Sequence, residues 1–304
     1  MTIQWFPGHM TRAKRQIADK LKLIDVVFEL IDARIPLSSR NPMVDDMIRA
    51  KPRLVLLNKA DLADEKHTQA WCAYFQELGH PALAIDAVSG AGLKHIQDQT
   101  RQLLRERHQR ELARGLKPRP ARALIVGIPN VGKSTLINRL AGRHVAATGD
   151  RPGVTKGQQW ISTGAQLELL DTPGILWPKF EDPQAGRLLA ATGAIKDELF
   201  HSDEVACHVL QILVAGYRDA LGQRYKLTDD LPRTLPDIPA AAQLLEAIGR
   251  RRGCLGSGGI VDYEKAAGVV LRDLRSGKLG RITLEWPKDA QPGERMGEVD
   301  GNGG

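Results

Sequence analysis

The chain has 304 residues, enough for two domains of ordinary size, and its hydrophobic fraction of 42% is ample for packed cores. No run of 18 apolar residues occurs and the first nine residues do not resemble a signal peptide, which argues against a membrane protein. The net charge of +7 is unevenly spread, with a surplus of nine positive charges in residues 1–178 and a deficit of two in residues 179–304. It favours a polyanionic partner, although this charge is also common without one.

Predicted strands and helices alternate through the first part of the chain. Apolar helical spacing in residues 11–24 is followed by apolar runs typical of strands and by two further helical segments. The expected strands cover residues 26–31, 53–57 and 82–85, and the expected helices pass through residues 71–78 and 94–114. The second of these helices is rich in arginine and is ended by Lys117-Pro118-Arg119-Pro120.

The alternation continues to about residue 178 and then stops. Strands are expected at 123–126, 158–161 and 167–170, with a helix at 134–140, and after residue 180 the helices 183–191, 203–217, 238–249 and 262–276. Six strands interleaved with helices predict an α/β domain over residues 1–178, with a mostly parallel six-stranded sheet and helices on both faces. A smaller all-α domain is expected over residues 179–290, followed by a flexible tail at 291–304.

A glycine-rich loop follows the strand expected at 123–126. Residues 127–134 read Gly-Ile-Pro-Asn-Val-Gly-Lys-Ser, a Gly-x-x-x-x-Gly-Lys-Ser pattern between a strand and a helix. This context predicts a phosphate-binding loop, in which backbone N–H groups and a helix N-terminus face the phosphates. Lys133 is expected to reach the β- and γ-phosphates, and Ser134 to bind Mg²⁺. The loop residues expected at the nucleotide are Asn130, Val131, Gly132, Lys133, Ser134 and Thr135.

A guanine-recognition loop is predicted at Asn58-Lys59-Ala60-Asp61, directly after the strand at 53–57. The Asp61 carboxylate would accept hydrogen bonds from N1–H and the 2-amino group of guanine, a donor pair that adenine lacks. The stem of Lys59 would pack over the base. Asp61 alone is also compatible with a helix-capping turn, but a phosphate loop elsewhere favours base recognition. Asp86-Ala87 resembles the Ser-Ala loop that supports the base, with Asp in place of Ser, which leaves the role of Asp86 open.

Two further segments are predicted to sense the γ-phosphate. Asp171-Thr172-Pro173-Gly174 matches an Asp-x-x-Gly turn, in which Asp171 holds Mg²⁺ through water and the Gly174 N–H contacts the γ-phosphate. Thr155 is the expected switch threonine, whose hydroxyl completes the Mg²⁺ shell, and it joins Lys133 among the predicted catalytic residues. Many GTPases place glutamine after this turn to orient water, but here the residue is Ile175, so slow intrinsic hydrolysis is expected.

The motifs stand in an unusual order. Ordinary GTPases run from the phosphate loop to the Asp-x-x-Gly turn and then to the guanine loop, whereas here the guanine loop comes first. This order predicts a circularly permuted GTPase, whose natural ends are joined near residues 117–120. The turn at Asp171 then lies directly before the helical domain.

With this order the chain resembles the bacterial ribosome biogenesis GTPase A family, of the YlqF/YawG group. The resemblance also rests on Trp5-Phe6-Pro7-Gly8-His9-Met10, on Asp32-Ala33-Arg34-x-Pro36 and on Asp171 to Pro178. It implies a GTPase that binds a late precursor of the large ribosomal subunit, contacts ribosomal RNA and ribosomal proteins, and leaves on GTP hydrolysis. It further implies GTP/GDP, Mg²⁺ and K⁺ as ligands, with K⁺ at Asn130, and a water-activating histidine at His9.

Other interpretations stay open. His9 could pack or bind RNA near the N-terminus, and the arginines at 101–114 could be solvated helix faces rather than contacts to RNA phosphates. A scaffold that binds RNA and carries a structural nucleotide is the main alternative function, although it needs no switch threonine. An ATP-dependent enzyme would lack the guanine loop. Three widely spaced cysteines fit a reducing cytoplasm, and a monomer without membrane contact is expected.

Overall fold

The computed structural model describes residues 18–42, 47–48, 50–116, 119–145, 160–163, 167–170, 182–227 and 231–287. Its sheet has six strands in the order β3-β2-β1-β4-β6-β5, and every neighbouring pair is parallel except β5 with β6. The strands are β1 (Val26–Asp32), β2 (Arg53–Asn58), β3 (Ala82–Ala84), β4 (Ala121–Val126), β5 (Trp160–Ser162) and β6 (Leu167–Leu170). The predicted mostly parallel six-stranded sheet is therefore confirmed.

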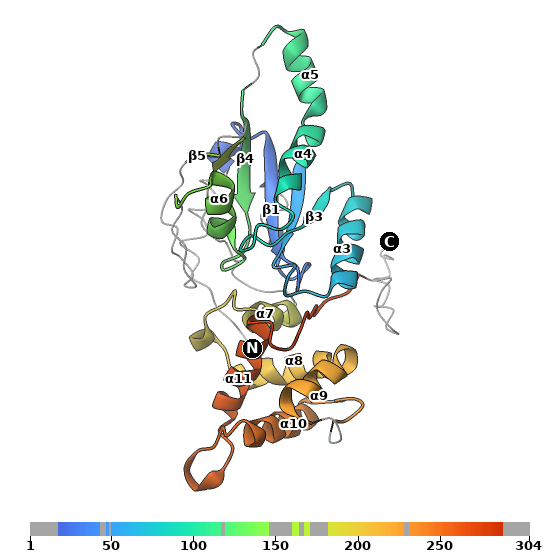
Figure 1. Cartoon of the computed structure of the whole chain (residues 1–304), viewed down its shortest axis with the longest axis vertical. Helices are drawn as coiled ribbons and strands as arrows, with labels where there is room; N and C mark the ends of the chain where they lie inside the picture. The colour runs from blue at the N-terminus through green and yellow to red at the C-terminus, as the bar shows by residue number, and fades with distance from the viewer. Residues whose placement is uncertain are drawn as a thin grey trace, which may run out of the picture.

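Both faces of this sheet are covered, which explains why its central strands read as continuous apolar runs. Every residue of β1 and β2 is buried. Along β1, Phe28 and Leu30 belong to a cluster shared with α4 (Lys94–Leu103) and α6 (Lys133–Ala141). Ile31 packs instead with the side of α3 (Glu65–Glu77) that carries Trp71 and Phe75. Helices thus lie on both faces, as expected (Figure 1).

The segment expected to be one helix over residues 94–114 is two helices. α4 ends at Leu103 and α5 (Arg105–Ala113) begins after Leu104, whose φ and ψ of −99° and 6° break the helix. No residue of α5 is buried, and its contact with the sheet domain is an ion pair between Arg107 and Asp25, the residue before β1. The helix α5 extends beyond the sheet (Figure 1).

The strand order predicts a ligand-binding crevice at one edge of the sheet. From β1 the chain moves outward to β2 and β3, and from β4 it moves outward in the opposite direction to β6. In open α/β sheets, ligands bind outside the carboxyl ends of the strands where the order reverses in this way. The residues that follow β1 and β4 therefore face this crevice.

The rest of the described chain is helical. It contains α7 (Pro183–Ala191), η1 (Asp197–Leu199), α8 (Ser202–Gly216), α9 (Arg218–Tyr225), α10 (Ile238–Arg251), η2 (Ser257–Gly259) and α11 (Tyr263–Arg275). The apolar helix α8 contacts α7, α9, α10 and α11 and is the centre of this bundle. The short helix α9 was not expected, because RDALGQRY has few large apolar residues and shows no clear helical period.

After α11 the chain returns to the sheet domain (Figure 1). The Ile282 N–H donates to the Leu62 carbonyl at 2.9 Å, and the Leu284 N–H donates to the Arg34 carbonyl at 2.7 Å. We call residues 282–285 the returning segment. It attaches the helical bundle to the two loops that follow β1 and β2.

Candidate functional site

The predicted guanine and phosphate loops meet through the side chain of Asn58. Its Nδ2 donates to the Val131 carbonyl at 2.7 Å, and its Oδ1 accepts from the Ala87 N–H at 3.0 Å. Asn58 is buried, as expected for the last residue of β2. One amide therefore links the three segments that the sequence assigned to a single nucleotide, although 73 residues separate Asn58 from Val131.

The phosphate loop has the strand–loop–helix context that its motif requires. It leaves β4 at Val126 and enters α6 at Lys133, and no cap side chain bonds the first N–H groups of α6 because the N-cap is Gly132. The Nζ of Lys133 turns back onto the loop and donates to the carbonyls of Gly127 (3.1 Å) and Ile128 (2.8 Å). Phosphate oxygens would offer this ammonium group stronger, charged acceptors at the same place.

Close approach explains both glycines of the motif. A Cβ on Gly127 would lie 2.5 Å from the Leu30 carbonyl oxygen of β1. A Cβ on Gly132 would lie 2.4 Å from Asn58 Nδ2, and the φ of +102° at Gly132 is one that other residues rarely adopt. These two residues let the loop pass against the neighbouring strand and the Asn58 bridge.

Lys59 is held by an ion-pair network after β1. The Asp32 carboxylate accepts from Lys59 Nζ at 3.0 Å and from Arg34 Nε and Nη2 at 2.9 and 2.8 Å. Burial alone would raise the pKa of Asp32, but attraction to the two cations outweighs it and holds this pKa far below its usual range. Burial lowers the pKa of Lys59, and Asp32 opposes this change. The network fixes the direction of the Lys59 stem.

Asp61 and Asp86 lie near each other in different surroundings. Partial burial raises the pKa of Asp61, and repulsion from Asp86 adds to the rise. The Asp86 carboxylate accepts from the N–H groups of Val88 (2.8 Å) and Ser89 (3.1 Å). Burial acts to raise the pKa of Asp86 too, but these hydrogen bonds outweigh it and lower the pKa. Asp86 thus shapes its own turn, an acceptor role that a serine oxygen in its place could also fill.

Asn130 faces the helical bundle. Its Nδ2 donates to the Gly193 carbonyl, just beyond α7, at 2.8 Å. Its φ of 57° is in the left-handed region, which asparagine tolerates better than most residues. A K⁺ ion at Asn130 would therefore have to be bound through Oδ1.

Several predicted residues lie outside the described part of the chain. These are His9, Thr155, Asp171, Gly174 and Ile175. Within the described residues, no group of three or more His, Cys, Asp or Glu side chains could hold a metal, and Ser134 is the one predicted Mg²⁺ ligand among them. The described part also contains no helix that is long and apolar enough to cross a membrane.

The described residues fit a nucleotide bound across the crevice. The α6 N-terminus and Lys133 would supply donors for phosphates, and Asp61 would supply the acceptor that guanine needs. Asp32 and Arg34 were missed as site residues. The signal was available, because Asp32 and Asn58 both end apolar strands, and in the register of β1 with β2 they are direct partners.

Comparison with known proteins identifies the family of the chain. A family described as "50S ribosome-binding GTPase" matches residues 122–234, which begin in β4 and so include the phosphate loop but not the earlier guanine loop. Ribosome biogenesis GTPase A of Bacillus cereus is 54% identical over 300 residues, covering 99% of this chain and 98% of that protein. Mitochondrial ribosome-associated GTPase 1 of Xenopus tropicalis is 32% identical, covering 92% and 94%.

Solved structures of the same family are similar to this chain. A GDP-bound structure of YlqF is 30% identical, with a TM-score of 0.60, and the match covers 90% of this chain and 100% of that one. YlqF from Thermotoga maritima bound to GNP is 29% identical, with a TM-score of 0.62, covering 91% and 99%. Family membership implies a guanine nucleotide and, in general, Mg²⁺. The chain therefore belongs to the ribosome biogenesis GTPase A (YlqF) family of circularly permuted GTPases, and it is a GTPase that acts in ribosome biogenesis.

Proposed function

We propose that this GTPase binds a late precursor of the large ribosomal subunit in its GTP form and leaves when GTP is hydrolysed. The observation that carries the nucleotide half of the proposal is the Asn58 bridge, which joins the guanine loop, the phosphate loop and Ala87. The names of the relatives and the "50S ribosome-binding GTPase" match support the ribosomal half.

In this proposal the residues divide by the part of the nucleotide they contact. Asn58, Lys59, Asp61, Asp86 and Ala87 form the base side, and the residues from Asn130 to Thr135 surround the phosphates. Ser134, Thr155 and Asp171 hold Mg²⁺, the Gly174 N–H contacts the γ-phosphate, and Asn130 Oδ1 binds K⁺. The GTPase domain then covers residues 1–178 and the ribosome-binding helical domain residues 179–290, with a tail at 291–304.

The partner surface in this proposal is basic and binds ribosomal RNA and proteins. Three basic residues have no ion-pair partner within the described chain: Lys94 on α4, Arg105 on α5 and Arg114 directly after α5. Arg101 and Arg110, by contrast, pair with nearby acids. Phosphates could recruit the first three without breaking an existing pair. We infer that the protein acts as a monomer in the cytoplasm, where its proposed partner is assembled.

His9 is proposed to orient or activate the attacking water, because Ile175 cannot do so. We expect His9→Ala to lower subunit-stimulated GTP turnover by at least tenfold, within the usual range for general acid–base groups. The affinity for GTP should stay the same. Turnover equal to that of the native protein would remove His9 from the mechanism.

The central test is GTP hydrolysis in K⁺ buffer, with and without purified large ribosomal subunits and their precursors. Strong stimulation supports the proposed switch, and a second series in Na⁺ buffer tests the K⁺ site. Measurable turnover without stimulation by any of these particles would contradict the ribosomal half of the proposal. Tight particle binding that is independent of nucleotide would favour the RNA-binding scaffold instead.

A further inference from the structure

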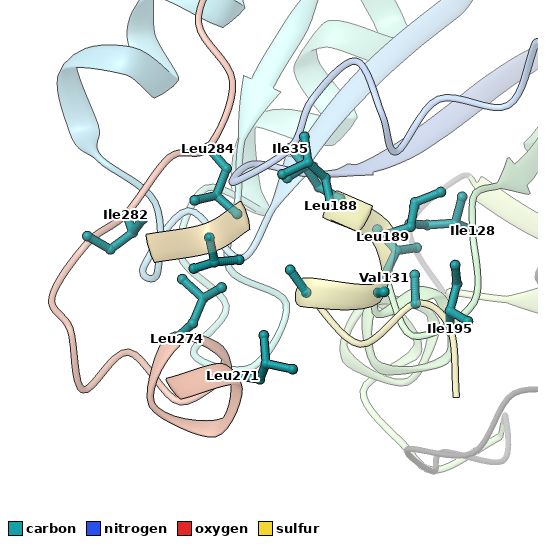
Figure 2. Packing of buried hydrophobic residues seen from close by; sticks show 14 of the residues in the cluster. Ile35, Ile128, Val131, Leu188, Leu189, Ile195, Leu271, Leu274, Ile282 and Leu284 are labelled. Atoms are coloured by element: carbon teal, nitrogen blue, oxygen red, sulfur yellow. The ribbon is translucent and has the colours of Figure 1, made fainter. Parts of the chain in front are cut away.

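The phosphate loop packs directly against the helical bundle. Ile128 and Val131 of the loop are buried in one cluster with Leu188, Leu189 and Ile195 from α7 and the turn after it. Figure 2 shows the two loop side chains beside Leu189 and Ile195. The polar contact between Asn130 Nδ2 and the Gly193 carbonyl lies in the same interface.

The turn that holds Asn130 is defined by local geometry. Gly193 has a φ of 84° and follows the last residues of α7. Its N–H donates to the Ala190 carbonyl at 3.1 Å, and the Ala194 N–H donates to the Leu189 carbonyl at 2.9 Å. This pair of bonds is the Schellman arrangement that ends many helices at a glycine. It directs the Gly193 carbonyl outward from the helix end, and that carbonyl accepts from Asn130.

A single arginine from a distant helix donates hydrogen bonds to the backbone at this turn. Arg275, the last residue of α11, donates from Nε to the Ala191 carbonyl at 3.0 Å and from Nη2 to the Ala190 carbonyl at 2.8 Å. It also forms a two-pronged ion pair with Asp197, at 3.1 and 2.8 Å. A guanidinium at this position gives the last carbonyls of α7 an additional, charged donor and opposes the negative end of the helix dipole.

We propose that Arg275 is a positioning residue for nucleotide binding, which acts through the Gly193 turn and Asn130 on the phosphate loop. The inference rests on the proposed role of that loop and adds a route from α11, in the proposed ribosome-binding domain, to the phosphates. Because binding free energies are reciprocal, a nucleotide that orders the loop also stabilises the contact between α7 and α11. A partner that displaces α11 would weaken nucleotide binding, and the nucleotide would weaken binding of that partner by the same factor.

The first test measures the affinity and dissociation rate of a fluorescent GDP analogue by stopped flow. Arg275→Ala should weaken binding about tenfold, mainly through faster dissociation. Arg272→Ala is the matched control, because Arg272 lies on the same helix, is exposed and has no ion pair or side-chain hydrogen bond with another described residue. It should bind the analogue within twofold of the native protein.

A double-mutant cycle tests the route. Asn130→Gly removes the amide but tolerates the φ of 57° at this position. If Arg275 acts through Asn130, Arg275→Ala should change the affinity of the Asn130→Gly protein by less than about threefold. Additive losses would mean that Arg275 acts through general stability, which would overturn the route.

Two further measurements keep the test decisive. If the Arg275→Ala protein shows no cooperative thermal unfolding, the Asp197→Ala protein replaces it in the test. Its affinity for the analogue should fall at least twofold, because Arg275 keeps its carbonyl contacts but loses its ion pair. Native-like binding by the folded Arg275→Ala protein, or by its Asp197→Ala replacement, overturns the inference alone. A native chain that fails to bind the analogue overturns both the inference and the proposed nucleotide site.

Discussion

Individual side chains at the predicted nucleotide site hold the loops that carry the predicted ligand-binding groups. Asn58 uses its Oδ1 to hold Ala87 and its Nδ2 to hold Val131, so both ends of its amide are occupied within the protein. The Asp32 carboxylate likewise holds the Lys59 side chain in place by accepting from its Nζ. Such contacts place the ligand-binding groups before the nucleotide arrives, which lowers the entropy that binding must overcome.

Base choice is predicted to depend on the carboxylate of Asp61. Asp61→Asn should lower GTP affinity at least 100-fold and favour xanthosine triphosphate, because the amide donates to the xanthine 2-carbonyl but cannot accept both guanine donors. Competition between the two nucleotides measures the switch. Asp64→Asn is the control, since Asp64 caps α3 through the His67 N–H and asparagine caps equally well. Unchanged preference in Asp61→Asn would move base recognition elsewhere.

Gly132 should tolerate no side chain. Gly132→Ala would place a Cβ against Asn58 Nδ2 at a φ of +102°, so we expect GTP affinity to fall at least 100-fold as the bridge is displaced. Gly142→Ala, at the other end of α6, has a φ of +66° but open space around the new Cβ. It should cost about 1 kcal/mol of stability and leave affinity unchanged. Similar affinities for both variants would contradict the steric argument.

At the scale of elements, the returning segment holds the loops after β1 and β2 in place. Its Glu285 carboxylate accepts from the N–H groups of Leu37 and Ser38 and from the Ser38 hydroxyl. The Glu285 carbonyl accepts from Trp71 Nε1 at 2.9 Å. Thr283 Oγ1 accepts from the Asp64 N–H at 3.1 Å. A segment from the end of the helical bundle thus holds α3 and both loops.

Glu285 should make the attachment of the returning segment sensitive to pH. Burial raises the pKa of Glu285 from 4.5 to about 7, even though its three donors favour the carboxylate. The folded state therefore retains a proton that the unfolded chain releases, and stability is lost as pH rises from about 4.5 to 7. A shift of this size corresponds to roughly 3 kcal/mol at most.

Urea unfolding between pH 4.5 and 8 measures this effect. The stability of the native protein should fall by roughly 2–3 kcal/mol relative to Glu285→Gln across that range, because the glutamine does not titrate. The difference in free energy of unfolding between the native and Glu285→Gln proteins should be constant above pH 8. A constant difference over the whole range would show that Glu285 stays ionised in the folded protein.

At the scale of the whole molecule, the chain has a net charge of +7 and its proposed partner is a large polyanion. Binding to the subunit precursor should weaken about 100-fold between 50 and 200 mM salt, which corresponds to about four phosphate contacts. Sedimentation of the GTP-loaded protein with the particles measures the slope. Charge reversal of Lys94, Arg105 and Arg114 together should reduce this dependence of binding on salt. A flat response would mean that these residues are solvated helix faces.

Much of the fold could be predicted because its signals are local. The apolar runs of β1, β2 and β4 and the spacing around the phosphate loop identified the sheet and its central loop. The break at Leu104 and the helix α9 could not be predicted. The first depends on one backbone conformation inside a polar helical pattern, and the second is held by α8 rather than by its own periodicity.

The amino-acid sequence was enough to predict the chemistry of the site. Phosphate and guanine recognition depend on residue types at fixed short spacing, and the order of the motifs along the chain is enough to reveal the permutation. Which residues hold these loops is known only from the three-dimensional structure. The contacts of Asn58 with Val131, Asn130 with Gly193 and Leu284 with Arg34 join residues far apart in the chain. They follow from strand order and from the packing of the helical bundle, which no local pattern encodes.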